Sequence, residues 1–172
     1  MSIVYFHPGE IFSMAKEIER TGARFYRTAA EGACFSRAAA KTAALADLRE
    51  LLLGLAAMED EHEKTFAALQ QGLSAKQGRE APQNEEAALY LRAWADGHVF
   101  AHKQDPAERL SGKETKEEIL TMAIGLEKDS IVFYVGIKEA IPPEWGREKI
   151  DVIIREEMGH VRLLDEKLSS LS

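Results

Sequence analysis

The sequence contains the stretch Ile150-Asp-Val-Ile-Ile-Arg-Glu-Glu-Met-Gly-His160-Val-Arg-Leu-Leu164, in which a Glu and a His interrupt an apolar helical stripe. Residues three or four positions apart share one face of a helix. The face defined in this way contains Ile150, Ile153, Glu157, His160, Leu164 and Leu168. Glu157 and His160 are therefore expected to point into the core, where an unpaired carboxylate is costly. A metal ion bound by Glu-x-x-His on adjacent turns would offset this cost, whereas a solvated Glu beside a hydrogen-bonded His is the alternative for an isolated pair.

A second stripe is interrupted in the same way. It contains Leu48, Leu52, Leu55, Glu59, His62, Phe66 and Leu69, again at steps of three and four. This helix is expected to end near Gly72, because glycine is favoured just after a helix C-terminus. An earlier helix is predicted from Ile11 to about Gly32, with Pro8 and Glu10 as its start signals.

The third long helix is predicted to begin at Thr115-Lys-Glu-Glu118, which matches a capping box, and to stop before Pro142-Pro143. The second proline is expected to start the last helix. Residues 74–112 are polar and rich in helix breakers, apart from a short helix that Asn84 can cap. They have too few apolar residues for a core of their own. Residues 1–172 are therefore predicted to form one all-α domain with four long helices and a long crossover between the second and third.

The chain contains an internal repeat. Met14-Ala-Lys-Glu-Ile-Glu19-Arg-Thr-Gly-Ala-Arg-Phe-Tyr26 aligns with Met122-Ala-Ile-Gly-Leu-Glu127-Lys-Asp-Ser-Ile-Val-Phe-Tyr134, and Glu59-Asp-Glu-His62 aligns with Glu157-Met-Gly-His160. In an antiparallel helical hairpin, residues equidistant from the turn lie at one level. Glu127 and Glu157 are equidistant from Pro142, and Glu19 and Glu59 are equidistant from Ala39. Four Glu and two His are therefore predicted to meet in the middle of one bundle.

Four carboxylates and two imidazoles at one place require cations. A pair of divalent ions about 3.5–4 Å apart would neutralise the four carboxylates. The mixture of oxygen and nitrogen donors favours iron or manganese over structural zinc, magnesium or calcium. We therefore predict a site of two metal ions, which are iron, manganese or a mixed pair. The predicted ligands are Glu19, Glu59, His62, Glu127, Glu157 and His160.

Two tyrosines lie near the predicted ligands. Tyr26 and Tyr134 each follow a ligand Glu by seven residues on the same helix face, a distance of about 10 Å along the axis. Each is expected to be a core tyrosine whose hydroxyl needs a partner. Each is also placed to donate a hydrogen bond to a ligand carboxylate on another helix. We predict no catalytic residue beyond the metal ligands and no organic cofactor.

These segments resemble the ferritin-like di-iron carboxylate superfamily and, within it, the rubrerythrin-like proteins. The resemblance is carried by Glu19-Arg-Thr-Gly-Ala-Arg-Phe-Tyr26 and Glu127-Lys-Asp-Ser-Ile-Val-Phe-Tyr134, each followed downstream by Glu-x-x-His. It covers the four long helices and leaves the crossover unmatched. It implies a ferritin-like antiparallel four-helix bundle that binds two irons, reacts with peroxide or dioxygen and often forms a homodimer.

The sequence departs from the rubrerythrin pattern at two places. Rubrerythrins usually carry a C-terminal rubredoxin-type iron site built from several cysteines, whereas the only cysteine here is Cys34. Electrons are therefore expected from a separate donor protein. Rubrerythrins also have an extra Glu one turn after the third-helix ligand, and Ser130 occupies that position here. The site is therefore expected to be more symmetric than that of a rubrerythrin.

Composition restricts the partners and the location. The 22 Lys and Arg residues against 29 Asp and Glu give a net charge of −7. This balance disfavours binding to nucleic acid or to an anionic membrane, which depends on clustered positive charge. A single cysteine permits no intramolecular disulfide and favours a reducing compartment. No window approaches the ~18 apolar residues of a membrane span, so we expect a cytoplasmic protein.

The residues support three functional hypotheses. The first is a redox enzyme with two iron ions bridged by Glu59 and Glu157. It would reduce peroxide or dioxygen, in defence against oxidative stress, with electrons from a separate donor protein. The second is an iron-binding or ferroxidase protein that handles iron without peroxidase turnover. The third is a metal-free structural bundle.

Other candidate residues are weaker. His98 and His102 are spaced as a metal-binding pair if that segment is helical, although exposed histidines are the alternative. Cys34 is interpreted as a small apolar filler rather than a reactive thiol. Four carboxylates that flank the ligands in sequence but lie off the stripes are interpreted as solvated, namely Glu17, Glu61, Glu63 and Glu156.

Overall fold

The structure is a computed structural model that describes residues 8–32, 43–73, 84–99 and 105–171. The described residues form helices and no strand, which confirms the predicted all-α class. The elements in chain order are α1 (Pro8–Glu31), α2 (Ala43–Gly72), α3 (Glu85–Val99), η3 (Pro106–Arg109), α4 (Lys116–Ala140), η4 (Pro143–Trp145) and α5 (Arg147–Ser169). None of the described helices is long and apolar enough to cross a membrane.

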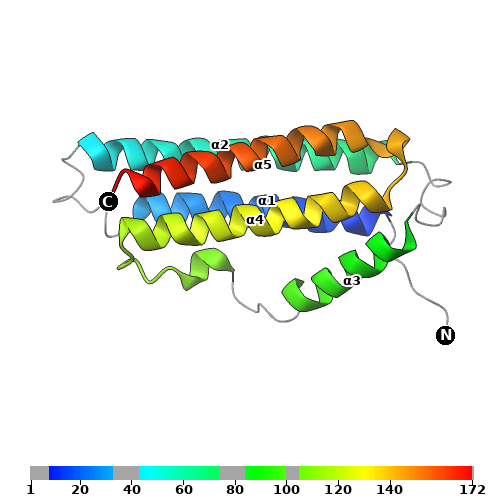
Figure 1. Cartoon of the computed structure of the whole chain (residues 1–172), viewed down its shortest axis with the longest axis horizontal. Helices are drawn as coiled ribbons and strands as arrows, with labels where there is room; N and C mark the ends of the chain where they lie inside the picture. The colour runs from blue at the N-terminus through cyan, green and yellow to red at the C-terminus, as the bar shows by residue number, and fades with distance from the viewer. Residues whose placement is uncertain (1–7, 33–42, 74–83, 100–104, 172) are drawn as a thin grey trace.

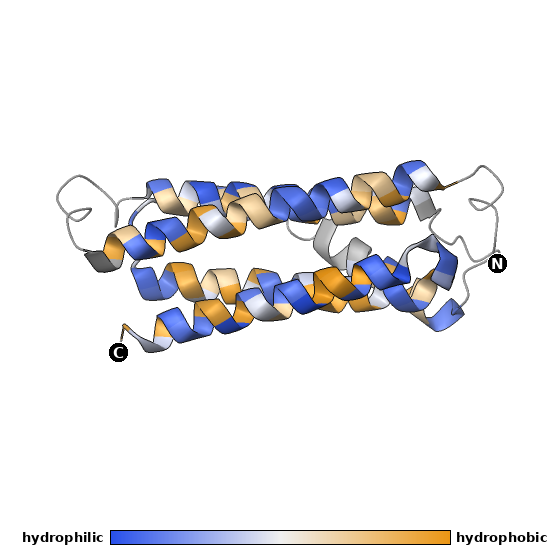
Figure 2. Cartoon of the chain, turned by 90° about the horizontal axis from the view of Figure 1, so that it is seen from above, coloured by the Kyte–Doolittle hydropathy of each residue, from blue (hydrophilic) through white to orange (hydrophobic). Residues whose placement is uncertain are grey.

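The four long helices form two antiparallel hairpins that lie against each other. α1 packs along α2 and α4 packs along α5. Figure 1 shows α2 and α5 in one layer and α1 and α4 in the other, and Figure 2 shows the same bundle from above. Polar contacts tie each hairpin together. In the first, the Arg20 guanidinium lies 2.7 Å from a carboxylate oxygen of Glu63. In the second, the Lys138 ammonium lies 3.0 Å from the carboxylate of Asp151.

α2 and α4 run in the same direction, because the chain between them returns along the length of the bundle (Figure 1). α3 lies in this connection and packs on α4. It begins where the Asn84 side chain accepts a hydrogen bond from the Ala87 amide at 3.1 Å. Gly136 of α4 permits the close approach, because a Cβ there would lie 2.7 Å from the Tyr90 ring and 2.9 Å from Leu91.

The ends of α4 show one confirmed prediction and one that is wrong. The predicted capping box is present: Thr115 Oγ1 accepts from the Glu118 amide at 3.1 Å, and the Glu118 carboxylate accepts from the Thr115 amide at 2.8 Å. The prediction that Pro143 starts the last helix is wrong. Pro143 starts the short 3₁₀ turn η4 instead, and α5 begins after Gly146, whose φ of 97° lies in the left-handed region.

The apolar core is divided into two clusters by the bundle centre. One cluster lies toward the η4 turn and includes Phe12, Phe66 and Ile150. The other lies toward the opposite end and includes Phe25 and Leu52. The buried polar and charged residues fall between these clusters along every long helix: Glu19, Glu59, His62, Glu127, Glu157 and His160. The fold therefore places one polar layer between two apolar ones.

Candidate metal centre

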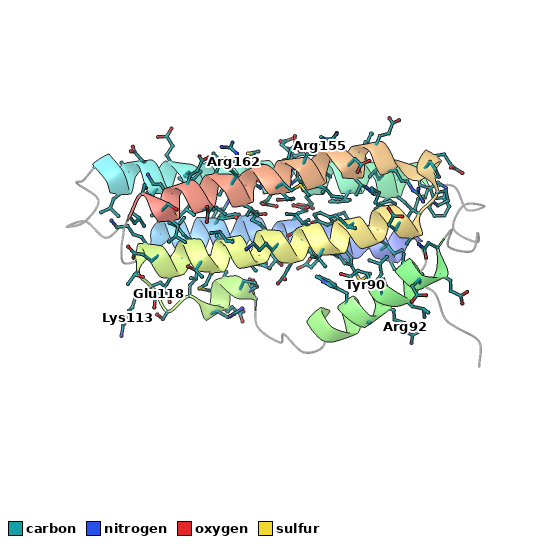
Figure 3. The ribbon with its side chains drawn as sticks, viewed as in Figure 1. Tyr90, Arg92, Lys113, Glu118, Arg155 and Arg162 are labelled. Carbon is teal, nitrogen blue, oxygen red and sulfur yellow. The ribbon has the colours of Figure 1, made fainter. Side chains whose placement is uncertain are left out.

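All six predicted ligands lie together inside the bundle. Each long helix contributes to the cluster, and no residue in it is more than 4% exposed. The positions follow from the helical stripes, because α1 and α4 each contribute one Glu and α2 and α5 each contribute a Glu and a His three residues later. In α5, the exposed Arg155 and Arg162 flank the buried pair in sequence, and Figure 3 labels both on the outer side of the bundle.

The cluster consists of two overlapping groups of ligand atoms. One group is Glu19, Glu59, His62 and Glu157, and the other is Glu59, Glu127, Glu157 and His160. The ligand atoms within each group lie within 4.8 Å of one another. Glu59 and Glu157 belong to both groups, which is the arrangement that bridging carboxylates require. The six residues can therefore form two adjacent cation positions with two shared ligands.

The two imidazoles turn the same ring nitrogen toward the carboxylates. His62 Nδ1 lies 3.0 Å from Glu157 Oε1 and 3.5 Å from Glu19 Oε2. His160 Nδ1 lies 2.9 Å from Glu157 Oε2 and 3.4 Å from Glu127 Oε1. The two rings are stacked with their centroids 5.8 Å apart. This near-symmetric geometry reflects the internal repeat.

The donor atoms fit a metal ion. Glu19 Oε2, His62 Nδ1 and Glu157 Oε1 are buried and form no hydrogen bond within the described part of the chain. His62 Nδ1 and Glu157 Oε1 are close, but their alignment is not that of a hydrogen bond. Buried polar atoms normally have a partner, and an unsatisfied one costs free energy. A cation between these atoms would satisfy them, and oxygen with imidazole nitrogen is a donor set that suits iron and manganese.

Burial dominates the ionisation of three of the four carboxyl groups. It raises the pKa of Glu19 to about 8 and the pKa of Glu127 to about 8, against partial compensation by hydrogen bonds. Burial, together with its hydrogen bond to Glu19, raises the pKa of Glu59 well above its ordinary value. Without metal, burial therefore favours the protonated form of these three groups.

For Glu157 and the two histidines, the surroundings favour the charged form. Burial favours the neutral Glu157, but the hydrogen bond with His160 and the close contact with His62 outweigh it and hold the Glu157 pKa well below its ordinary value. Burial disfavours the imidazolium forms, yet contacts with Glu157 raise the pKa of His62 to about 9, and contacts with Glu127 and Glu157 raise that of His160 to about 10. Without metal, the centre is therefore a carboxylate between two imidazolium rings.

Tyr26 and Tyr134 cross between the hairpins to hold the two carboxylates that are not shared. The Tyr26 hydroxyl donates to Glu127 Oε1, and the Tyr134 hydroxyl donates to Glu19 Oε1. Both rings are at most 1% exposed. Burial and the adjacent carboxylates raise the pKa of both phenols well above the ordinary value. The hydroxyls therefore stay protonated and act as hydrogen-bond donors.

Glu156 is a residue of the site that the sequence analysis interpreted as solvated. Its side chain is 45% exposed, yet its Oε2 atom lies 3.0 Å from His62 Nε2. A carboxylate at this distance fixes the ring orientation of a histidine that binds metal through the other nitrogen. The position aligned with Glu156 in the first repeat is Met58. His160 Nε2 accordingly has no hydrogen-bond partner among the described residues.

The remaining candidates do not join the cluster. Ser130 is half-buried, and its hydroxyl donates to the Leu126 carbonyl at 2.9 Å within α4. His98 lies in α3, but its side chain is outside the described part of the structure, as are Cys34 and His102. Glu17, Glu61 and Glu63 are not among the buried residues, and they pair with Arg20 or Lys64.

Comparison with solved structures identifies the fold. The chain is similar to a protein from Thermotoga maritima whose crystal structure at 2.30 Å resolution is provisionally described as that of a ferritin-like diiron-carboxylate protein. The TM-score is 0.68 at 21% sequence identity, and the match covers 99% of this chain and 100% of the other. No family model and no curated protein matches the sequence. At this identity the likeness establishes the fold.

Proposed function

We propose, from the ferritin-like fold of the chain and its buried cluster of four carboxylates and two imidazoles, that the protein holds two iron ions and reduces peroxide or dioxygen. The observation that carries the proposal is the pair of overlapping ligand groups that share Glu59 and Glu157. The description of the Thermotoga maritima protein as a diiron-carboxylate protein supports iron as the metal. Manganese and a mixed pair use the same donors.

The six proposed ligands are assigned to two metal positions. Glu19 and His62 would hold one ion, Glu127 and His160 the other, and Glu59 and Glu157 would bridge the two. When bound, the iron pair would supply two electrons and polarise the oxygen substrate. Tyr26 and Tyr134 would keep Glu127 and Glu19 oriented through their hydroxyl groups. The apolar clusters cover the polar layer on both sides along the bundle axis.

The proposed reaction needs two electrons and two protons for each peroxide. Hydrogen peroxide is reduced to two water molecules as its oxygen–oxygen bond breaks. The only cysteine of the chain is Cys34, so the chain has no cysteine-cluster iron site of its own. We therefore propose a separate protein as the electron donor, and a homodimer as the functional assembly.

Anaerobic reconstitution tests the proposal. We expect the metal-free protein to bind two ferrous ions per chain, and stoichiometric peroxide to be consumed with oxidation of both ions. The readouts are the metal content, the near-ultraviolet absorption of the ferric protein and the remaining peroxide. Glu157→Gln serves as the control that lacks a shared ligand. Binding of fewer than two ions, or peroxide loss no faster than with the same ferrous ion in buffer, would contradict the proposal.

A ferroxidase is the second candidate, and Ser130 favours it. Because position 130 is a serine, it supplies no additional carboxylate beside Glu127. The half-buried Ser130 hydroxyl donates its hydrogen bond to the Leu126 carbonyl of the same helix. A ferroxidase and a peroxidase differ in the substrate that they consume in many turnovers. A ferroxidase oxidises many ferrous ions per chain and releases them, whereas a peroxidase consumes many peroxides per chain with a chemical reductant present. Assembly size separates mineral storage, which needs a closed shell, from a dimer.

A further inference from the structure

A cavity of about 530 Å³ opens onto the candidate metal centre from the side that carries the crossover. Its walls come from α1 and α4, and Trp94 of α3 and Pro106 of η3 also line it. Glu59, Glu127 and Tyr26 of the centre contribute to its lining. A molecule in this cavity would therefore contact carboxylates that we propose as metal ligands.

Small side chains create the space. Ser130 lines the cavity where a longer side chain on α4 would fill it. Gly22 of α1 also lines the cavity, and the atoms nearest to a Cβ at this position belong to the Glu59 side chain, the first at 3.4 Å. Both helical walls therefore carry a small residue in the lining that also contains Glu59.

The cavity is much larger than peroxide or dioxygen requires. One water molecule occupies about 30 Å³ of liquid, and a cavity of about 150 Å³ accommodates benzene. The volume of about 530 Å³ is within the range of about 300–1,000 Å³ that is typical of sites for organic ligands. The space would hold an organic molecule of about two fused rings or the equivalent chain.

The lining indicates the chemistry of the ligand. Met14, Ile18 and Leu126 join Trp94 in an apolar surface. Besides Glu59 and Glu127, three acidic side chains line the cavity, namely Glu17, Asp105 and Asp129, and the basic side chain in the lining is Arg109. Asp105 already pairs with Arg24. An apolar surface favours an apolar ligand, and the acidic excess disfavours an anionic one.

We infer that this cavity is a binding site for an apolar organic molecule without negative charge, held beside Glu59 and Glu127. The inference deepens the proposed function, because it adds an organic ligand to a site proposed for metal and a small oxygen substrate. The inference rests on the cavity and not on the metal, so the inference and the proposed function can be contradicted separately.

Calorimetric titration of the full-length metal-free protein with 2-naphthalenemethanol tests the inference. We expect saturable binding of one molecule per chain, and nuclear Overhauser effects from the naphthalene protons to the Met14 methyl group. 2-Naphthoate has the same rings with a negative charge, and we expect it to bind at least about tenfold more weakly. Absence of saturable binding up to the solubility limit, or equal affinity for naphthoate, would overturn the inference.

Two substitutions on α4 give a matched pair. Ser130→Phe fills the cavity and should reduce the affinity for 2-naphthalenemethanol by at least about tenfold. Val132→Phe places the same ring at a position that is 50% exposed, and should leave the affinity unchanged. Equal affinities of the two variants would overturn the inference. Ile18→Phe fills the cavity from α1 and replaces Ser130→Phe if circular dichroism shows that the latter is unfolded.

The metal content of the same variants separates this inference from the proposed function. Ser130 is not a proposed ligand, so Ser130→Phe should still bind two ferrous ions. Glu157→Gln should lose metal and keep its affinity for 2-naphthalenemethanol. If the wild-type protein binds two ferrous ions but does not bind 2-naphthalenemethanol, only the cavity assignment is overturned.

Discussion

Glu157 differs from the other carboxyl groups of the cluster because both imidazoles contact it. Its two oxygens lie 3.0 Å from His62 Nδ1 and 2.9 Å from His160 Nδ1. These contacts keep its pKa low, whereas burial raises the pKa of Glu19 and Glu127 to about 8. The negative charge of the metal-free centre is therefore concentrated on Glu157, which belongs to both ligand groups.

Replacement of a shared ligand should affect both metal positions. We expect Glu157→Gln to weaken ferrous binding at both, because Glu157 belongs to both groups. Glu127→Gln should weaken binding mainly at one position, because Glu127 belongs to a single group. Stepwise metal titration followed by native mass spectrometry measures both effects. Retention of one tight ion in Glu157→Gln would contradict the bridging assignment.

Glu156→Gln should weaken metal binding at the position of His62. The amide keeps the size of the side chain but removes the negative charge that lies 3.0 Å from His62 Nε2. Loss of such a partner typically lowers metal affinity about 10–100-fold. Competition with a chelator measures the affinity of each ion. Glu61→Gln, at an exposed position that pairs with Lys64, is the control and should bind as wild type.

The reciprocal variant examines the other half of the repeat. Met58 stands where Glu156 stands in the second hairpin, and His160 Nε2 has no partner among the described residues. Met58→Glu should therefore tighten binding at the His160 position. An unchanged affinity in both Glu156→Gln and Met58→Glu would show that these outer contacts do not influence the metals.

The sequence located the six clustered residues because each interrupts an apolar stripe and the interruption occurs twice at the same spacing. Glu156 was missed because periodicity places it off the stripe, and only the packing of α5 against α2 brings it to His62. The cavity was also missed. It depends on where Trp94 and Pro106 lie, and these residues belong to the crossover, which has no strong periodicity.

At the scale of the helices, two hydroxyl contacts connect the hairpins. Tyr26 of α1 reaches Glu127 of α4, and Tyr134 of α4 reaches Glu19 of α1. Both contacts are buried and related by the internal repeat. They therefore fix α1 and α4 relative to each other at the level of the polar layer, even without metal.

Tyr134→Phe should destabilise the metal-free protein. The change leaves Glu19 Oε1 buried without its donor, which costs about 1–3 kcal/mol. Urea denaturation measures the free energy of unfolding. Tyr90→Phe is the matched control, because the Tyr90 ring is 38% exposed and its hydroxyl makes only a long contact of 3.4 Å with the Val132 carbonyl. Equal stability of Tyr134→Phe and Tyr90→Phe would contradict the structural role of the buried hydroxyl.

Gly146→Ala should destabilise the turn before α5. Gly146 has a φ of 97°, and a Cβ at this position would lie 2.2 Å from Leu69 Cδ2. The strained backbone alone costs about 1–3 kcal/mol, and the contact with Leu69 adds to it. Thermal unfolding measures the effect. Gly125→Ala is the control, since a Cβ there meets nothing within 4 Å and alanine is favoured inside a helix. A melting temperature equal to wild type in Gly146→Ala would contradict the turn geometry.

The long helices were predictable because strong apolar periodicity agrees with local signals for the start or the end of a helix. The capping box at Thr115 and the glycine at the end of α2 are such signals. The beginning of α5 was not predictable from the two prolines alone. The turn uses three residues in η4 and a left-handed glycine, and the Gly146 backbone is accommodated against Leu69 of another hairpin.

At the scale of the whole molecule, the metal-free protein should lose stability as the pH rises. The pKa values of Glu19 and Glu127 are about 8 in the fold against 4.5 ordinarily, and those of His62 and His160 are about 9 and 10 against 6.5. The folded state therefore binds more protons than the unfolded state, and the free energy of unfolding falls with rising pH from about 5 to about 10. Glu157 has the opposite effect because its pKa is lowered in the folded state. Its contribution to stability is present above the ordinary pKa of 4.5 and is lost as the pH falls below that value.

Denaturant unfolding of the metal-free protein at several pH values measures this dependence. We expect greater stability near pH 5 than near pH 9. Metal binding should release protons from the raised carboxyl groups and from the histidines, so metal affinity should increase with pH. Calorimetry in buffers of different ionisation enthalpy counts the released protons. Stability that rises between pH 5 and pH 9 without metal would contradict the assigned ionisation states.

The internal repeat has a consequence for the origin of the molecule. Each hairpin supplies one Glu and one Glu-x-x-His, which is half of the cluster. Two identical hairpins related by a two-fold axis would assemble the same six ligands, so an ancestral homodimer of a shorter chain could have formed this centre. In such a dimer both copies of any residue change together. A single chain that contains both hairpins is free of that constraint, and Glu156 opposite Met58 is a difference of this kind.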